Sequence, residues 1–178
     1  MIKTVKIFIL NISILALTAC VSVNSTSIPE NKILDNDIKI FFTPGIECEN
    51  NIIDRINKSN KIDIAVYSIT NPDITHAIIA AYKRGADIRV ITDRTQSKGK
   101  NSLVDTIKKS GIPTLTNKKH KIEHNKFAVF DDNYIVSGSY NWTTNASMYN
   151  SENCIFFKQP NKEYSLRFEQ LWNIYNNN

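Results

Sequence analysis

Apolar side chains divide the chain beyond residue 37 into short strands and amphipathic helices. Apolar runs of about four to eight residues are typical of strands, whereas apolar positions three or four residues apart mark one helix face. The pair Asn71-Pro72 indicates a helix start and Gly85 a helix end. The pattern predicts strands at 38–42, 62–69, 88–92, 126–131, 134–139 and 154–158, and helices at 49–58, 72–84, 103–110 and 164–175.

The order of these elements predicts the fold class. Strands and helices alternate in the first half, which implies a largely parallel sheet with helices on its faces. In the second half, Asp132-Asn133 joins two strands and is a tight hairpin signal. We therefore expect an α/β fold in which a mixed β-sheet is sandwiched between helices, as a single domain over residues 38–178.

The first 20 residues have the pattern of a signal peptide. Lys3 and Lys6 precede an apolar stretch at 7–19. This stretch is too short for a stable membrane-spanning helix, which needs about 20 apolar residues. We expect residues 1–20 to direct export to the bacterial cell envelope. Residues 21–37 are rich in Ser, Asn and Thr and are predicted to form a flexible tether.

The end of this leader resembles a bacterial lipobox. It reads Leu17-Thr18-Ala19-Cys20, and the resemblance implies cleavage before Cys20 and lipidation of that cysteine. The alternative is an ordinary signal peptide cut near Ala19. Lipidation would tie the mature protein to a membrane, whereas ordinary cleavage would leave it in the periplasm or outside the cell.

Composition sets few limits on function. The chain has 178 residues, of which 42% are hydrophobic, as in a globular protein with a core. Its 22 basic residues exceed the 17 acidic ones only slightly, and two of the basic ones lie in the leader. This balance permits a polyanionic partner without requiring one. Cys48 and Cys154 could form a disulfide in an oxidising compartment, or Cys154 could be a small buried hydrophobe.

Reactive side chains gather between residues 124 and 153. His124 and Lys126 lie two residues apart in a strand, so both should point to the same side. The hairpin after them should bring Ser139 and Asn141 back beside this pair. Lysine and amide donors can offset the charge of a phosphodiester, and a neutral imidazole can then attack phosphorus to form a phosphohistidine. Glu152 could accept the Nδ1–H of His124 and fix its tautomer.

The same residues carry a family resemblance. His124-x-Lys126-x4-Asp131 followed by Gly138-Ser139-x-Asn141 resembles the signature of the phospholipase D superfamily, and its small bacterial Nuc-like endonuclease branch in particular. The resemblance covers residues 38–175. It implies that His124 is the nucleophile, that Lys126 and Asn141 bind phosphate with support from Ser139, and that Glu152 orients the histidine. Asp131, which belongs to the motif, is in that family more structural than catalytic.

The chain holds one such motif, although the mechanism needs two histidines. One imidazole attacks phosphorus and the other protonates the leaving oxygen. The simplest arrangement is a homodimer with a shared active site, which the resemblance also implies. No metal or other cofactor is expected, because His120 and His124 make only half of a zinc-site spacing.

Three functions remain in competition. Lys118, Lys119 and Lys121 beside the motif, with Arg94 and Lys98 as weaker candidates, form either a solvated lysine run or a groove that follows a phosphate backbone. The groove would favour an endonuclease acting on DNA or RNA. A phospholipase D that hydrolyses membrane phospholipids fits the expected lipid anchor. A non-enzymatic envelope protein is the third, against which the intact motif argues.

Overall fold

The computed structural model describes residues 38–158 and 162–177 of the chain. The predicted leader, the tether and Cys20 lie outside these ranges. The strands are β1 (Lys39–Phe42), β2 (Lys61–Val66), β3 (Asp87–Thr92), β4 (Thr114–Thr116), β5 (Lys126–Phe130), β6 (Tyr134–Gly138) and β7 (Asn153–Lys158). The helices are α1 (Glu47–Lys58), α2 (Pro72–Lys83), α3 (Val104–Lys109), α4 (Thr144–Met148) and α5 (Glu163–Asn176), with a 3-10 turn at Gln96–Lys98.

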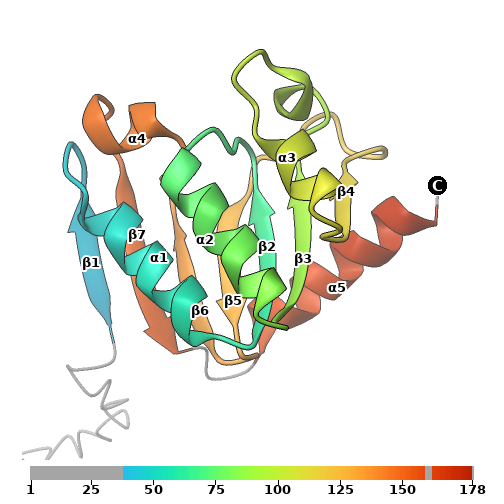
Figure 1. The fold of residues 1–178 in the computed structure, drawn as a ribbon, viewed down its shortest axis with the longest axis horizontal. Helices are drawn as coiled ribbons and strands as arrows, with labels where there is room; N and C mark the ends of the chain where they lie inside the picture. Colours follow the sequence, from blue (N-terminus) through green and yellow to red (C-terminus); the bar gives the residue numbers. More distant parts are fainter. Residues whose placement is uncertain (1–37, 159–161, 178) are drawn as a thin grey trace, which may run out of the picture. The chain divides into compact units, whose positions relative to one another are not determined.

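All seven strands form one mixed sheet in the order β1-β7-β6-β5-β2-β3-β4. The neighbours β2, β3 and β4 are parallel, and the remaining neighbours are antiparallel. Helices α1, α2 and α3 lie on one face of the sheet and α5 on the other (Figure 1). The predicted mixed sheet between helices is therefore confirmed.

The larger core lies between the sheet and α1, α2 and α3. It contains apolar side chains that alternate along the strands, such as Ile62 and Ile64 of β2, together with Ile74 and Ile78 of α2. Helix α2 begins as predicted, because the side chain of Asn71 accepts hydrogen bonds from the backbone of Asp73 and Ile74.

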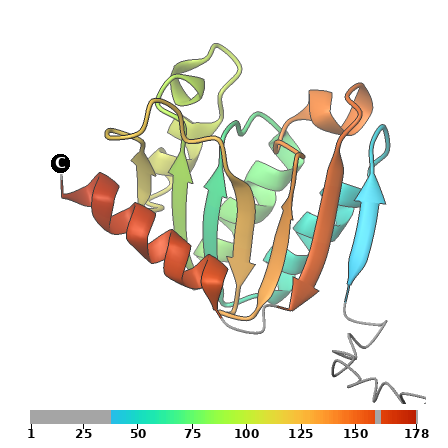
Figure 2. The same ribbon diagram turned by 180° about the vertical axis from the view of Figure 1, so that it is seen from behind.

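Helix α5 covers only part of the opposite face. It crosses β2, β3 and β4, whereas no described helix covers β7 and β1 on this face (Figure 2). Phe168, Leu171 and Tyr175 of α5 are fully buried against the sheet. Arg89 of β3 fastens the helix, because its guanidinium binds the buried Asp63 and also Glu169.

Three details differ from the sequence-based prediction. The edge strand β1 pairs with β7 and is antiparallel to it. The parallel part of the sheet is therefore smaller than expected. The hairpin loop has three residues, 131–133, instead of the predicted two, and Asp131 and Asp132 in it have positive φ angles. The short elements β4 and α4 were not predicted, because three to five residues carry too little periodic pattern.

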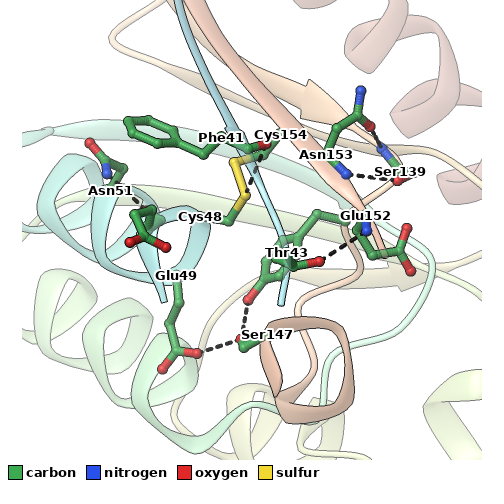
Figure 3. Close-up of a disulfide and its surroundings, with 12 residues drawn as sticks. Phe41, Thr43, Cys48, Glu49, Asn51, Ser139, Ser147, Glu152, Asn153 and Cys154 are labelled. Atoms are coloured by element: carbon green, nitrogen blue, oxygen red, sulfur yellow. Dashed lines mark hydrogen bonds between the residues drawn. A yellow bond between two sulfur atoms is a disulfide. The ribbon is translucent and has the colours of Figure 1, made fainter. Parts of the chain in front are cut away.

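Cys48 of α1 and Cys154 of β7 form a disulfide (Figure 3). Their Cα atoms are 6.0 Å apart although 106 positions separate them in the sequence. The sequence left this pairing open. The bond joins the first helix to the strand that begins at Asn153, directly after Glu152.

Candidate active site

Five of the six predicted catalytic side chains line one pocket, at the edge of the sheet that is formed by strand ends. The pocket measures about 460 Å³ and is lined by His124, Lys126, Gly138, Ser139, Asn141 and Glu152. It lies where the carboxyl end of β2 meets the start of β5, because Val66 pairs with Lys126. Such edges are where α/β sheets commonly bind ligands, since strand ends and loops converge there.

His124 lies two residues before the start of β5, and its side chain is exposed. Its ring contacts that of Tyr67, with 4.6 Å between the two centroids. Tyr67 follows β2, and its backbone N–H donates to the carbonyl of Asn125 at 2.8 Å. The ladder between β2 and β5 thus continues past the strands and holds Tyr67 beside the predicted nucleophile.

Lys126, the first residue of β5, is half-buried next to His124. Its ammonium donates to the backbone carbonyl of His124 at 2.8 Å and lies 4.9 Å from the centre of the Tyr67 ring. Burial lowers the pKa of Lys126, while the charges of Glu152 and Glu123 oppose that shift. An ammonium has three donors, so two remain for a ligand in the pocket.

The glycine of the G-S-x-N motif permits a close approach between β6 and β7. A Cβ atom on Gly138 would lie 2.3 Å from the carbonyl oxygen of Asn153, and its φ of +148° is one that glycine adopts readily. The next residue, Ser139, donates its N–H to the side chain of Asn153 and accepts the backbone N–H of Asn153 at its Oγ. These bonds fix the position of Ser139 in the pocket wall, with its hydroxyl proton still to donate.

Asn141 lines the same pocket. Its Oδ1 is buried and has no hydrogen-bond partner within the described chain. Buried amide oxygens usually have a partner. Because Oδ1 can only accept, a phosphate oxygen would be bound by the side-chain NH₂ group of Asn141 instead.

The predicted hydrogen bond between Glu152 and His124 is not formed within the described chain. The carboxylate of Glu152 instead accepts the side-chain amide of Asn150 at 3.1 Å. The backbone of Glu152 is tied to Thr43 at the end of β1 (Figure 3). Glu152 remains in the pocket, where its charge acts on Lys126.

Asp131 lies outside the pocket, which corrects its grouping with the catalytic side chains. It follows the carboxyl end of β5, whereas His124 precedes the amino end of the same strand. Its carboxylate accepts the backbone N–H groups of Asn60 and Lys61 at 2.9 and 3.0 Å. This motif residue therefore fastens the hairpin to the start of β2.

The predicted substrate-binding cations lie on loops at the same edge of the sheet as the pocket. Arg94 and Lys98 follow β3, and Lys118, Lys119 and Lys121 follow β4; all five are exposed. The two loops are joined, since Asn117 Oδ1 accepts the backbone N–H of Arg94. None of the five lines the pocket itself.

Sequence reasoning missed two features of the site. Tyr67 was not assigned a role, although it contacts both His124 and Lys126. Glu123, next to the nucleophile, is only 2% exposed and was not singled out. A buried carboxylate is unusual, and nothing in the local sequence pattern indicated that position 123 is buried.

The described residues contain neither a cluster of metal-binding side chains nor a helix that could cross a membrane. No group of three or more His, Cys, Asp and Glu side chains is placed to hold a metal ion, and His120 contacts Tyr175 rather than His124. Within the same residues, no helix combines the length and apolar character needed to cross a bilayer.

The chain is similar to known proteins in both sequence and structure. The family described as "Cardiolipin synthase, PLD-like domain" matches residues 52–172. The mitochondrial cardiolipin hydrolase of Chlamydomonas reinhardtii is 31% identical over 116 residues, which are 64% of this chain and 52% of that protein. The phospholipase D of Rickettsia felis is 29% identical over 143 residues, 80% of this chain and 70% of that protein. This chain spans about half of the length of the cardiolipin hydrolases from Chlamydomonas reinhardtii and Danio rerio.

Solved structures give the same grouping. Nuc from Salmonella typhimurium, a phospholipase D family member, is 30% identical with a TM-score of 0.71, over 76% of this chain and 93% of that one. NucT from Helicobacter pylori shares the fold, at 24% identity and a TM-score of 0.70, over 76% of this chain and 95% of that one. The family match and the relationship to Nuc establish that this chain belongs to the phospholipase D superfamily.

Proposed function

We propose that the protein is a phosphodiester hydrolase that acts through a covalent phosphohistidine at His124. The observation that carries this proposal is the single pocket shared by His124, Lys126, Ser139 and Asn141. An imidazole nucleophile thus lies beside ammonium, hydroxyl and amide donors, which suit a phosphate. The family supports the same class of reaction.

The chemistry takes two steps. An imidazole nitrogen of His124 attacks phosphorus, and the ester oxygen leaves with a proton from a second imidazole. That second imidazole then takes a proton from water, and the resulting hydroxide breaks the phosphorus–nitrogen bond and restores His124. Lys126 and Asn141 stabilise the phosphoryl oxygens in both steps.

For the substrate we propose nucleic acid, cleaved as by an endonuclease. The exposed cations that follow β3 and β4 support this choice, because they extend the binding surface from the pocket along one edge of the sheet. The resemblance to the Nuc-like endonucleases supports it too. The second candidate is a membrane phospholipid, which the names of the relatives from Rickettsia and Chlamydomonas favour.

One assay separates these candidates. Purified mature protein is incubated with plasmid DNA, with RNA and with phosphatidylcholine or cardiolipin vesicles, all in the presence of a chelator. We expect cleavage of nucleic acid that survives the chelator and is lost in His124→Ala. Head-group release without nucleic-acid cleavage would assign the protein to the second candidate. Inactivity toward every substrate would favour a non-enzymatic envelope protein.

The second imidazole would come from a second copy of the chain. The uncovered part of the α5 face supports such a homodimer, since Ile40 and Phe42 of β1 are 52% and 70% exposed and Leu166 of α5 is 59% exposed. Phe42 pairs with Asn153, which holds Ser139 in the pocket. A second hollow of about 360 Å³, lined by Phe127, Tyr164 and Arg167, also reaches His124 and Lys126. This hollow shares His124, Lys126 and Gly138 with the pocket and extends from it to the start of α5.

Co-expression tests the shared site. If wild-type and His124→Ala chains assort freely into dimers, activity should fall as the square of the wild-type fraction. A linear decrease would contradict the shared site. The double variant Ile40→Asp, Phe42→Asp should be monomeric by sedimentation and inactive. If it remains dimeric, the two copies meet elsewhere, and if the wild type is monomeric, the proposed shared site is wrong.

We also propose that the protein is exported and lipidated at Cys20. The Cys48–Cys154 disulfide supports an oxidising location, because such bonds are rare in the cytosol. Cell fractionation and mass spectrometry of the N-terminal peptide test this proposal. Cys20→Ser should release the protein from the membrane fraction, whereas an unmodified N-terminus near residue 20 would indicate ordinary secretion.

A further inference from the structure

The loop before His124 is held by buried polar side chains from distant parts of the chain. It runs from Asn117 to Asn125, between β4 and β5. Asp93, Asn117 and Glu123 are each at most 2% exposed, which is rare for such residues. Oδ2 of Asp93 accepts the backbone N–H of Glu123, and the side-chain amide of Asn117 donates to the carbonyl of His120. The loop backbone is therefore held in place by hydrogen bonds to these buried side chains.

The last turn of α5 reaches the same loop through Tyr175. The hydroxyl of this fully buried tyrosine lies 2.8 Å from Oε2 of Glu123 and 2.6 Å from Nδ1 of His120. An ionised carboxylate can only accept, so Tyr175 donates to Glu123 and must accept from the Nδ1–H of His120. Oε1 of Glu123 in turn accepts the backbone and side-chain N–H groups of Asn125. The hydrogen bonds thus converge on the carboxylate of Glu123, which accepts from Tyr175 on one oxygen and from Asn125 on the other.

This arrangement bears on the nucleophile itself. Within the described chain no hydrogen bond holds the His124 ring, whose recorded contact is the packing against Tyr67. The ring position therefore depends on the backbone of residues 123–125. Both neighbours of His124 are bound into the network, Glu123 by its carboxylate and N–H and Asn125 by its amide and N–H.

We infer that Tyr175 and Glu123 are positioning residues for His124. The C-terminal helix α5, which carries Tyr175, thus helps to set the geometry of the active site. Tyr175 holds the loop in place by its hydroxyl, and Arg89 fastens the helix that carries it to β2 and β3. Glu123 also contributes to the electrostatics of the pocket, since its negative charge joins that of Glu152 in favouring the protonated form of Lys126 against the effect of burial. The catalytic part of this inference rests on the proposed function, whereas the structural part does not.

Two isosteric substitutions separate the two roles. Tyr175→Phe keeps the ring in the core but breaks the chain of hydrogen bonds, and leaves the charge of Glu123 in place. Glu123→Gln removes the charge, while its amide can still bond to Tyr175 in the reverse direction. Tyr82→Phe is the matched control, because its hydroxyl donates to the carbonyl of Gly111, away from the pocket.

Hydrogen exchange and NMR test the inference without any substrate. In Tyr175→Phe we expect the amides of residues 118–126 to exchange about fivefold faster or more, with β6 and β7 unchanged. In Glu123→Gln we expect the side-chain amine of Lys126 to titrate at lower pH. If Tyr175→Phe alters this loop no more than Tyr82→Phe does, the positioning role is overturned. An unchanged titration of Lys126 in Glu123→Gln would overturn the electrostatic role.

Kinetics with an active substrate complete the test. Because small displacements of a reacting group are costly, Tyr175→Phe should lower kcat about tenfold or more and leave KM within about twofold. Tyr82→Phe should keep the wild-type kcat. A change in KM alone would contradict positioning of the nucleophile. If the wild-type protein hydrolyses nothing, the proposed function fails, while the exchange and titration results still decide the structural inference.

Discussion

The rings of Tyr67 and His124 lie 4.6 Å apart, centre to centre, with their planes inclined by 58°. The same tyrosine ring lies 4.9 Å from the ammonium of Lys126. An aromatic side chain from the end of β2 thus contacts both of the charged or ionisable groups that begin the motif. Contacts of this kind restrict how the two side chains can move when the pocket is empty.

Removing the Tyr67 ring should therefore weaken catalysis more than removing its hydroxyl. Tyr67→Leu takes away the aromatic face, and we expect kcat to fall about tenfold. Tyr67→Phe keeps the ring and loses only the hydrogen bond from Gln96, so its kcat should stay within about threefold of wild type. Steady-state kinetics measure both, and equal losses in the two variants would show that the ring contact is unimportant.

The lowered pKa of Lys126 predicts the alkaline limit of activity. The side chain must be protonated to hold the phosphate, so activity should be full below its pKa and lost as pH rises through it. Because burial lowers this pKa from the ordinary value of 10.5, the loss should set in below pH 10.5. A pH profile of kcat checks this limb, with Lys126→Arg as the comparison. Arginine stays charged, so any activity it retains should not decline over this range.

Asp131 should matter for stability and not for chemistry. Asp131→Ala removes the acceptor of two backbone N–H groups at the start of β2, which should cost about 1–3 kcal/mol of unfolding free energy. Urea unfolding measures this loss. The kcat of the folded variant should match wild type, since Asp131 lies at the far end of β5 from the pocket. A hundredfold loss of kcat at unchanged stability would return Asp131 to the catalytic group.

The disulfide should contribute strongly to stability. It closes a long loop, with 106 positions between Cys48 and Cys154, for which chain entropy predicts about 4–5 kcal/mol. The double variant Cys48→Ser, Cys154→Ser should lose roughly this amount in urea unfolding, as should wild type treated with a reductant. Reductant should have no effect on the double variant. If reduction leaves the wild type unchanged, the bond is not formed in the protein.

Gly138 should not accept a side chain. In Gly138→Ala the new Cβ would clash with the carbonyl of Asn153, so β6 and β7 would have to separate where they hold Ser139. We expect a loss of about 1–3 kcal/mol in unfolding free energy together with reduced kcat. Gly85→Ala is the control, because nothing lies within 4 Å of its added Cβ although its φ is also positive. Its kcat should remain that of wild type.

The sequence by itself determined the longer strands and helices and the part of the pocket that the motif supplies. Alternation in a strand places His124 and Lys126 on one side, and a hairpin must return Ser139 and Asn141 to them. These are consequences of local backbone geometry, which acts between residues close in the chain. The same geometry would have placed Asp131 away from the pocket, at the other end of a five-residue strand.

Only the tertiary structure decided which distant residues complete the site. Tyr67, Glu123 and Tyr175 come together because β2 pairs with β5 and α5 packs across the sheet. The edge position of β1 and the Cys48–Cys154 pair depend in the same way on strand order. Such contacts arise when apolar faces of separate elements are buried against one another, and that burial selects partners by the shape of the whole core rather than by spacing along the chain.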